Sequence, residues 1–437
     1  MLYRTLSAPI SVQVEVTEAC NQLCCYCYNF WRQERSVALP RVTNQETLTK
    51  IASALADAEV FFCTITGGEP LLSRGVQNLT LHLLKLLGGF GIPCDLNSNL
   101  THVDTPLLKE LKVAGLRSIL TSLSSYDVAT HERIVGAVGA YEKSLQGILC
   151  AKEVGFSVGV SMVLTSQNQD MIYQTGMLAA KLGARSFFAT RMGHPDILGD
   201  FVLVLPTEDA IHRSLDTLVE LSRNTNLRVG VLEPYPLCFI GDMSKYSSLI
   251  NKRCSAGTTT CAIGADGSVR SCPHSSKVYG NILDESLKII WERMSDLRDG
   301  SLLPQECIEC PSFYICGGGC RVASKFDPRA RGMDPLASGS HNVIGTPTKT
   351  LRATPPSRFR VVGGVCFRNE NFGGIVSSSV GKVEIAFLKH GSYEMFLEIR
   401  KEASILLEDL PRRFGIGLAE AAMMISVLHQ KKIIEVS

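Results

Sequence analysis

The sequence predicts an α/β fold: a partial (β/α)6 TIM-like barrel, then a cysteine-rich region and a small winged-helix-like α+β module. Three observations predict it. Between residues 10 and 235 a β-rich run, a loop and an amphipathic helix alternate six times, cysteine-rich loops follow to about residue 320, and three strand-like runs precede two helices after residue 358. Repeated βα units favour a parallel sheet that curls into part of a barrel.

The predicted barrel strands are rich in β-branched and aromatic residues. The stretches between them, such as 105–115 and 141–155, carry apolar residues at three- and four-residue spacing with a glycine near the end, which is typical of amphipathic helices. The strands are expected at 10–16, 60–67, 92–99, 116–123, 157–164 and 184–192. Parallel strands place their carboxyl ends at one rim, so the loops with CNQLCCYC, GGEP, NSN and SSYD are expected to build the site.

The predicted domains follow the changes in composition. They are the barrel (1–240), the cysteine-rich domain (241–337), a linker rich in Pro, Gly, Ser and Thr (338–357) and the last module (358–437). That module is expected to have strands at 358–368, 373–379 and 382–388 and helices at 393–409 and 417–431.

Composition limits the partners and the compartment. The 44 Lys and Arg nearly cancel the 42 Asp and Glu, so no net charge recruits nucleic acid or an anionic membrane. No apolar run approaches the roughly 20 residues that span a bilayer, and we expect a cytoplasmic protein. Sixteen cysteines in a reducing compartment favour metal ligation over disulfides.

Three cysteines directly after the first strand, Cys20, Cys24 and Cys27, form a CxxxCxxC pattern. Three thiolates on one loop can hold three irons of a four-iron cube and leave the fourth iron open. A zinc site is the alternative, and it would need a fourth nearby ligand in tetrahedral geometry. Cys25 is available for that role, although adjacent thiols are hard to aim at one ion.

This cysteine pattern, together with the TGGEP motif (66–70) after the second strand, resembles the radical S-adenosylmethionine (SAM) superfamily. The resemblance implies that the open iron of a [4Fe-4S] cluster chelates SAM. It also implies that an electron splits SAM to methionine and a 5′-deoxyadenosyl radical, which abstracts hydrogen from a substrate. The protein then has to place and shield this chemistry.

The resemblance also implies the SAM-binding residues. Glu69 would oppose the methionine ammonium, the two glycines before it would allow close backbone approach, and Tyr26 would lie against adenine. NSNLT stands where relatives often have TNGT, with Leu100 in place of the glycine, and Ser124 stands where relatives carry an acid. The expected SAM-binding residues are Tyr26, Gly67, Gly68, Glu69, Pro70, Ser98, Asn99, Ser122 and Arg191. No catalytic acid or base stands out.

A second group of seven cysteines lies between residues 254 and 320. Seven exceed what one zinc ion requires, so iron–sulfur clusters or two zinc ribbons would account for them. The spacing resembles the SPASM extension, which implies two auxiliary [4Fe-4S] clusters and three clusters in all. On that pattern the first auxiliary cluster takes Cys254, Cys261, Cys272 and Cys320, and the second takes Cys307, Cys310 and Cys316.

The eighth auxiliary ligand is left open by the sequence. Ala337 stands where relatives often have a cysteine, so Cys366, a non-cysteine ligand such as His341, or an open iron completes the second cluster. The other cysteines are expected to be buried or incidental thiols: Cys25, Cys63, Cys94, Cys150 and Cys238.

The last module resembles PqqD-like domains, which bind the leader peptides of ribosomally made, post-translationally modified peptides. The run FRNENFGGIV, the amphipathic segment SYEMFLEIRKEASILLEDL (392–410) and the ending SVLHQKKIIEV (426–436) carry this resemblance. An edge strand at 382–388 would offer backbone groups to an extended peptide beside an apolar helix. A plain packing or dimerisation module is the alternative, and a DNA-reading role lacks a basic recognition helix.

The sequence therefore predicts a radical SAM maturase that installs a crosslink, excision or oxidation in a precursor peptide. Its expected partners are that peptide and a low-potential electron donor such as flavodoxin or ferredoxin, with no nucleic acid and no membrane. One alternative is a SPASM enzyme of haem-type tetrapyrrole biosynthesis. Another is a sulfatase-maturing oxidase, against which Pro273 after Cys272 counts, because relatives of that type have an acid there. A non-catalytic multi-cluster electron carrier is the third.

Overall fold

The computed structural model describes residues 3–32, 39–193, 203–250, 252–325, 332–339, 343, 345, 354–378 and 384–437. His341, most of the predicted linker and the first two residues of the predicted run 382–388 lie outside these residues. The chain divides into two compact units, residues 1–347 and 348–437. No described helix is both long and apolar enough to cross a membrane.

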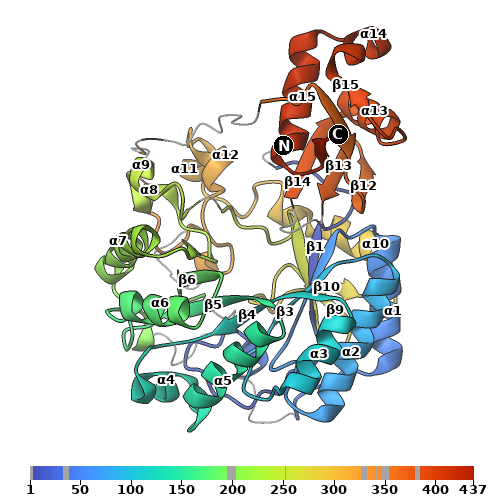
Figure 1. The fold of residues 1–437 in the computed structure, drawn as a ribbon. Helices are drawn as coiled ribbons and strands as arrows, with labels where there is room; N and C mark the ends of the chain where they lie inside the picture. The colour runs from blue at the N-terminus through green and yellow to red at the C-terminus, as the bar shows by residue number, and fades with distance from the viewer. Residues whose placement is uncertain are drawn as a thin grey trace. The chain divides into compact units, whose positions relative to one another are not determined.

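The larger unit is a curled parallel sheet with helices on its outer side (Figure 1). Strands β1 to β7 lie side by side in chain order and pair in parallel. The six predicted strands correspond to β1 to β6, and β7 adds a short seventh. Their bounds are β1 (Ser11–Glu15), β2 (Phe62–Thr66), β3 (Cys94–Asn97), β4 (Leu116–Ser122), β5 (Ser157–Leu164), β6 (Ser186–Arg191) and β7 (Arg228–Gly230).

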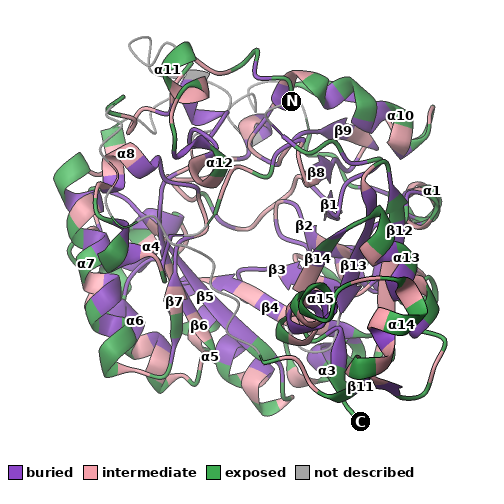
Figure 2. Cartoon of the chain, turned by 90° about the horizontal axis from the view of Figure 1, so that it is seen from above, coloured by how far each residue is buried: buried purple, intermediate pink, exposed green. Residues whose placement is uncertain are grey.

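Each barrel helix buries one face against this sheet. In the view of Figure 2 the strands are largely buried, while the helices turn exposed residues outward. Side-chain oxygens cap several helix N-termini, for example Asn44, whose Oδ1 accepts the Thr47 N–H at 2.8 Å. The helices are α1 (Gln45–Asp57), α2 (Arg74–Gly89), α3 (Thr105–Val113), α4 (Val128–Val135), α5 (Ala140–Glu153), α6 (Ile172–Lys181) and α7 (Glu208–Asn224).

The cysteine-rich region continues the barrel sheet, which the sequence did not predict. β8 (Thr260–Ile263) pairs in parallel with β1, and β9 (Ser268–Arg270) and β10 (Val278–Asn281) follow as antiparallel strands. The region therefore shares the core of the larger unit. Its helices are short: α8 (Leu237–Ile240), α9 (Met243–Tyr246), α10 (Leu287–Glu292), α11 (Gln305–Ile308) and α12 (Phe313–Cys316), with 3-10 turns at Phe30–Arg32, Arg293–Leu297 and Ala323–Lys325.

The smaller unit has two three-stranded sheets with their own apolar core. The single strand predicted at 358–368 is wrong, because Gly364 has a φ of 75° and a turn there sends β11 and β12 into different sheets. The predicted helix 393–409 ends at Ile399, whereas the prediction of 417–431 matches α15 closely. The elements are β11 (Arg358–Val361), β12 (Val365–Glu370), β13 (Gly373–Ser378), β14 (Glu384–Lys389), α13 (His390–Ile399), β15 (Ile405–Leu406), a 3-10 turn (Leu407–Asp409), α14 (Leu410–Phe414), α15 (Leu418–Gln430) and β16 (Ile434–Val436).

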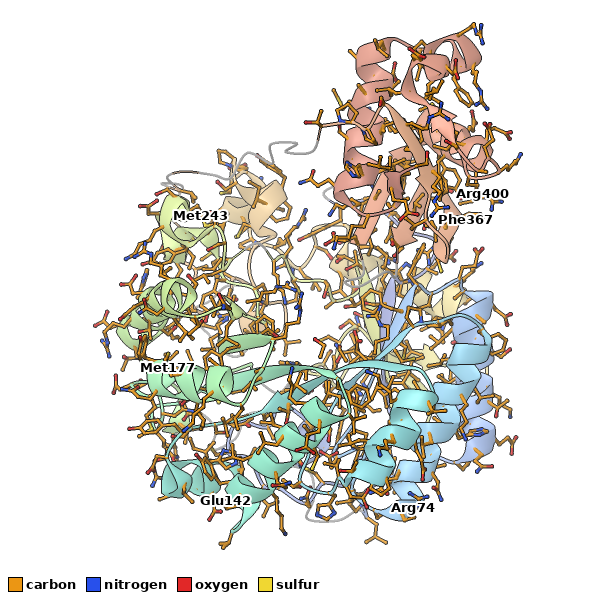
Figure 3. The ribbon with its side chains drawn as sticks, in the orientation of Figure 1. Arg74, Glu142, Met177, Met243, Phe367 and Arg400 are labelled. Carbon is orange, nitrogen blue, oxygen red and sulfur yellow. The ribbon has the colours of Figure 1, made fainter. Side chains whose placement is uncertain are left out.

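Within the smaller unit, α13 packs closely on the sheet of β12, β13 and β14. A Cβ on Gly374 of β13 would lie 2.2 Å from the Tyr393 ring, so the absence of a side chain there lets the helix approach. The guanidinium of Arg400, at the end of α13, lies 4.3 Å from the centre of the Phe367 ring on β12 (Figure 3). These contacts make the sheet and the helix one rigid surface.

Candidate functional site

The GGEP loop and the segment before the first cysteines are bound together through backbone groups. The Gly68 N–H donates to Thr17 O at 2.6 Å and the Glu69 N–H to Ala19 O at 2.8 Å. Gly67 has a φ of 139°, and a Cβ on Gly68 would lie 2.1 Å from Ala19 O. Both glycines were predicted to allow close approach of SAM. The structure shows that the close approach of the Thr17–Ala19 backbone already requires a glycine at both positions.

Glu69 is the centre of a buried hydrogen-bond network that joins two predicted motifs. Its carboxylate, in a residue 1% exposed, accepts the Leu71 N–H at 2.9 Å, the Ser98 hydroxyl at 2.7 Å and the Asn99 N–H at 2.8 Å. Burial raises the pKa of Glu69, although these donors favour the charged form. Ser98 and Asn99, predicted as SAM contacts, are therefore brought to Glu69 and hold its carboxylate in place. Pro70 follows as a buried residue whose carbonyl accepts the Thr80 hydroxyl at 2.7 Å.

Leu100 keeps the backbone conformation that a glycine would adopt there. Its φ is 58°, which costs a non-glycine residue roughly 1–2 kcal/mol. The side chain is 1% exposed in the main core, and a Cβ on Gly147 of α5 would lie 2.2 Å from Leu100 O. Residue 100 therefore adopts a left-handed conformation that favours glycine, although it is a leucine.

The cysteine loop rests on α4 and on the NSN loop. The Leu23 and Cys25 N–H groups donate to the carbonyls of Val135 and Ile134 at 2.8 and 2.9 Å. Asn21 accepts the Asn99 side-chain N–H at 2.9 Å and donates to the Thr101 hydroxyl at 2.8 Å. These bonds fix the loop that carries the half-buried thiols of Cys20, Cys24 and Cys27 at the rim.

Tyr26 points its hydroxyl at residues at the end of β4 and just after it. The hydroxyl lies 3.3 Å from the Ser124 hydroxyl and also interacts with Ser122. Its desolvated position raises the pKa of Tyr26 well above its usual range. Ser124, which stands where relatives have an acid, is fully buried, and its N–H donates to His131 Nδ1 at 3.2 Å. Tyr26 and Ser122 are thus brought together as predicted partners of one site.

The residues at this rim fit a SAM-binding iron–sulfur cluster. Three half-buried thiols come from one loop, a buried carboxylate lies next to it, and two glycines remove side chains between them. In the part of the chain that the structure describes, no three His, Cys, Asp or Glu side chains gather closely enough to hold a single metal ion. A cube makes no such demand, because each thiolate binds a different iron.

Arg191 joins the barrel to the cysteine-rich region. Its guanidinium is 5% exposed, donates to Asp334 at 2.7 Å through one nitrogen, and donates to Pro234 O at 2.7 Å through the other. Asp334 also accepts the Cys320 N–H at 2.7 Å. The predicted contact of Arg191 with SAM stays a prediction, since the visible partners of its charge belong to the protein.

Three of the four cysteines predicted for the first auxiliary cluster lie together. Cys272 packs against Cys320, and both interact electrostatically with Cys254 and Glu233. Cys261 lies elsewhere: it is fully buried on β8, in register with Val12, and interacts with Cys63 on β2. β8 extends the barrel sheet and carries this thiol into the core, so the place of Cys261 in the first auxiliary group stays a prediction.

The three cysteines predicted for the second auxiliary cluster line one pocket together with a fourth cysteine. Cys307, Cys310 and Cys316 line one pocket with Cys238, which was expected to be an incidental thiol. Ala337 lines the same pocket. Cys366 lies on β12 in the smaller unit.

Two residues that the sequence analysis missed connect the cysteine sites. The Tyr28 ring, one residue after Cys27, stacks on the His274 ring with centroids 4.1 Å apart. His274 Nε2 lies 3.6 Å from Glu233, which neighbours the first auxiliary group. Because Tyr28 and His274 lie just after Cys27 and Cys272, their sequence positions could have indicated that they are near the cysteine sites. Their stacking could not be predicted, because it depends on how distant segments fold.

Comparison with known families agrees with this geometry. Residues 14–179 match the radical SAM superfamily, and residues 254–311 match the SPASM iron–sulfur cluster-binding domain. The chain carries a radical SAM domain and a SPASM domain. These two domains bind SAM and iron–sulfur clusters, so the prediction of these two kinds of cofactor is confirmed.

Known proteins resemble this chain over most of its length. It is 26% identical over 391 residues to the mycofactocin maturase MftC of Mycolicibacterium smegmatis, covering 82% of this chain and 95% of that one. It is 24% identical over 334 residues to an AdoMet-dependent heme synthase of Methanosarcina barkeri, covering 72% and 92%. The crystal structure of Streptococcus suis SuiB bound to precursor peptide SuiA has the same fold, with a TM-score of 0.60, 18% identity and 76% of each chain covered.

Proposed function

We propose that the protein is a radical SAM peptide maturase, which abstracts hydrogen from a ribosomally made precursor peptide to install a crosslink, excision or oxidation. The observation that carries the proposal is that the chain has both a SAM-type rim and a separate unit whose sheet β12–β13–β14 has β14 as an edge strand. The mycofactocin maturase and the peptide-bound SuiB structure support it. We place the protein in the cytoplasm, because the cytoplasm keeps cysteine thiols reduced and thus able to bind metal.

The residues at the rim have distinct tasks in this proposal. Cys20, Cys24 and Cys27 hold the cluster, and Glu69 opposes the charge of the SAM ammonium. When bound and reduced, SAM and its cluster supply the 5′-deoxyadenosyl radical that abstracts hydrogen. Tyr26, within the cysteine loop, lies against the adenine of SAM in this proposal. The remaining residues, Gly67, Gly68, Pro70, Ser98, Asn99 and Ser122, shape the loops around it.

Two auxiliary [4Fe-4S] clusters complete the proposed set of three. Cys254, Cys272 and Cys320, with Cys261 as the predicted fourth ligand, hold the first, and Cys307, Cys310 and Cys316 hold the second. The stacked Tyr28 and His274 lie between the first cysteine loop and the first auxiliary group. An auxiliary cluster bound by these cysteines would supply a one-electron acceptor for an oxidation, and a flavodoxin or ferredoxin is the proposed electron donor.

The C-terminal unit is proposed to dock the leader part of the peptide on β14. β14 is an edge strand of the sheet β12–β13–β14, and an edge strand can pair with an extended peptide. Its Ala386 and Leu388 are buried, while Phe387 is 41% exposed. Phe387 therefore offers an apolar anchor beside the backbone groups of the edge.

A second candidate is a SPASM enzyme that oxidises a haem-type tetrapyrrole, which the AdoMet-dependent heme synthase relatives favour. The two functions differ in the substrate that the rim accepts. Anaerobically reconstituted enzyme should be mixed with reductant, SAM and either the product of a neighbouring small reading frame or a porphyrin. A peptide mass change together with 5′-deoxyadenosine formation supports the maturase, and porphyrin decarboxylation supports the second candidate. The absence of both products contradicts both candidates.

The docking proposal is tested by a matched pair of variants in the C-terminal unit. Phe387→Glu places a charge at the proposed anchor and is expected to weaken peptide binding at least about tenfold, as for loss of an interface anchor. Val436→Glu makes the same change at an exposed residue of the other sheet, 66% exposed, and should bind like wild type. Equal affinities in fluorescence anisotropy would show that the peptide docks elsewhere.

A further inference from the structure

Four thiols line one pocket in the cysteine-rich region: those of Cys238, Cys307, Cys310 and Cys316. The space in the pocket that protein atoms leave empty is about 440 Å³, part of it open to solvent. Cys238 interacts electrostatically with both Cys307 and Cys316. One thiol from a segment nearly seventy positions earlier in the chain thus joins three that are close in sequence.

Short helices bring these thiols together. Cys307 lies in α11 and Cys316 ends α12, and Cys310 lies between them, with its N–H on Cys307 O at 3.3 Å. Cys238 lies in α8, and the N–H of Leu237 beside it donates to the sulfur of Cys316 at 3.4 Å. α8 is therefore bonded directly to the group and does not merely pass near it.

The opposite wall holds α8 in this position. The Ser338 hydroxyl donates to Cys238 O at 3.2 Å, and its loop begins at Asp334, which the buried Arg191 pairs with. Ala337 of this loop lines the pocket and offers no ligand atom on its side chain. Among the lining residues, only Cys238 adds a thiol to the three cysteines of the SPASM pattern.

We propose that Cys238 is the fourth protein ligand of the second auxiliary iron–sulfur cluster, and this inference rests on the second cluster of the proposed function. Fe–S clusters take thiolate ligands, and four thiolates give each iron of a cube one protein ligand. The cluster is then closed to substrate. Its role becomes electron transfer, and Cys366 is not needed to complete it.

The test is to follow iron and cluster type in full-length, anaerobically reconstituted protein. Wild type is compared with Cys238→Ala, Cys307→Ala and Cys366→Ala, and Cys150→Ala is the matched control, because that half-buried thiol lies on α5 outside the predicted sites. Iron, zinc and sulfide per chain are measured together with Mössbauer and EPR spectra. Circular dichroism checks folding, and Cys238→Ser serves as a second variant that keeps the size and polarity of the side chain.

Wild type with three cubes should hold about 12 irons per chain. Cys238→Ala is expected to lose between about one and four of them, with the EPR signal of an oxidised three-iron cluster where the cube survives in part, while Cys366→Ala and Cys150→Ala match wild type. Cys238→Ser should keep more iron than Cys238→Ala but alter the EPR spectrum of one cluster.

Three results would overturn the inference. If Cys307→Ala loses iron while both Cys238 variants keep wild-type iron and spectra, the second cluster exists and Cys238 is not its ligand. If Cys366→Ala is the variant that loses iron, the fourth ligand comes from the smaller unit. If even Cys307→Ala keeps all its iron, or zinc replaces iron there in wild type, the proposed second auxiliary cluster falls together with the inference.

Discussion

The two cysteine regions of the molecule are held in place by different forces. The N-terminal cysteine loop is fixed by backbone and neutral side-chain hydrogen bonds to α4 and the NSN loop. The auxiliary region is fixed by buried ion pairs between distant segments: Arg191 with Asp334, and Arg270 of β9 with Glu15 of β1. The first site therefore depends on neutral hydrogen bonds, while the second depends on buried charges that must remain paired.

The largest effect that tests this comparison is expected at Cys24. Cys24→Ala removes a proposed ligand, so it should lose about four irons per chain and abolish SAM cleavage. Cys25→Ala is the matched control, because the Cys25 N–H is held by Ile134 and burial raises the pKa of its thiol, which is typical of an unreactive cysteine. Iron analysis and chromatography of 5′-deoxyadenosine measure both. Equal losses in the two variants would contradict the assignment of Cys24.

The auxiliary region should lose stability sharply when one partner of its ion pair is removed. Asp334→Asn leaves the Arg191 charge buried without its counter-ion, so it should lower the free energy of unfolding by about 3–5 kcal/mol. The double variant Arg191→Met with Asp334→Leu should lose less, because no charge is stranded. Urea unfolding measures the three proteins.

An exposed pair provides the control for that experiment. Glu46→Gln breaks the pair with Lys50 on the surface of α1 and should change stability by less than about 1 kcal/mol. If Asp334→Asn unfolds at the same urea concentration as Glu46→Gln, buried charge does not hold the auxiliary region.

The two regions also differ in how much of their structure the sequence predicted. The barrel strands and the motifs at the rim follow from local patterns: alternation of apolar residues, cysteine spacing and the GGEP turn. The network from Glu69 to Ser98 and Asn99 joins motifs whose strands β2 and β3 are neighbours, so it follows the predicted strand order.

What the sequence could not predict depends on contacts between distant segments. β8 extends the barrel sheet and buries Cys261, and α8 lies against α12 and brings Cys238 to the pocket of Cys307, Cys310 and Cys316. Nothing in the spacing of the cysteines distinguishes a thiol that faces the core from one that faces a pocket. The division of 358–368 into two strands was visible in its Gly-Gly pair, but the assignment of those strands to different sheets was not.

The NSN loop should respond to a change in the helix behind it. Gly147→Ala would place a Cβ 2.2 Å from Leu100 O, so the loop or α5 must shift, at a cost of about 1–3 kcal/mol. Because the same loop positions Glu69, SAM affinity should fall as well. Gly88→Ala in α2, where the nearest atom is an ordinary 3.8 Å away, should raise stability by up to about 1 kcal/mol. Equilibrium dialysis measures the SAM affinity. If Gly147→Ala binds SAM as wild type does, the position of this loop does not affect SAM binding.

The smallest expected effect concerns His131, which supports the Ser124 N–H behind Tyr26. His131 is fully buried, and burial lowers its pKa to about 4 although Glu132 opposes the shift. Above pH 6.5 the histidine is neutral in both the folded and the unfolded chain; as the pH falls from 6.5 towards 4 only the unfolded chain gains the proton, so stability is lost. Between pH 7.5 and 5.5 the loss should be about 1.4 kcal/mol. His131→Asn offers Oδ1 to the Ser124 N–H but does not titrate, so its urea midpoint should fall less over this range. Parallel pH dependences of the two proteins would show that His131 takes up its proton equally in both states.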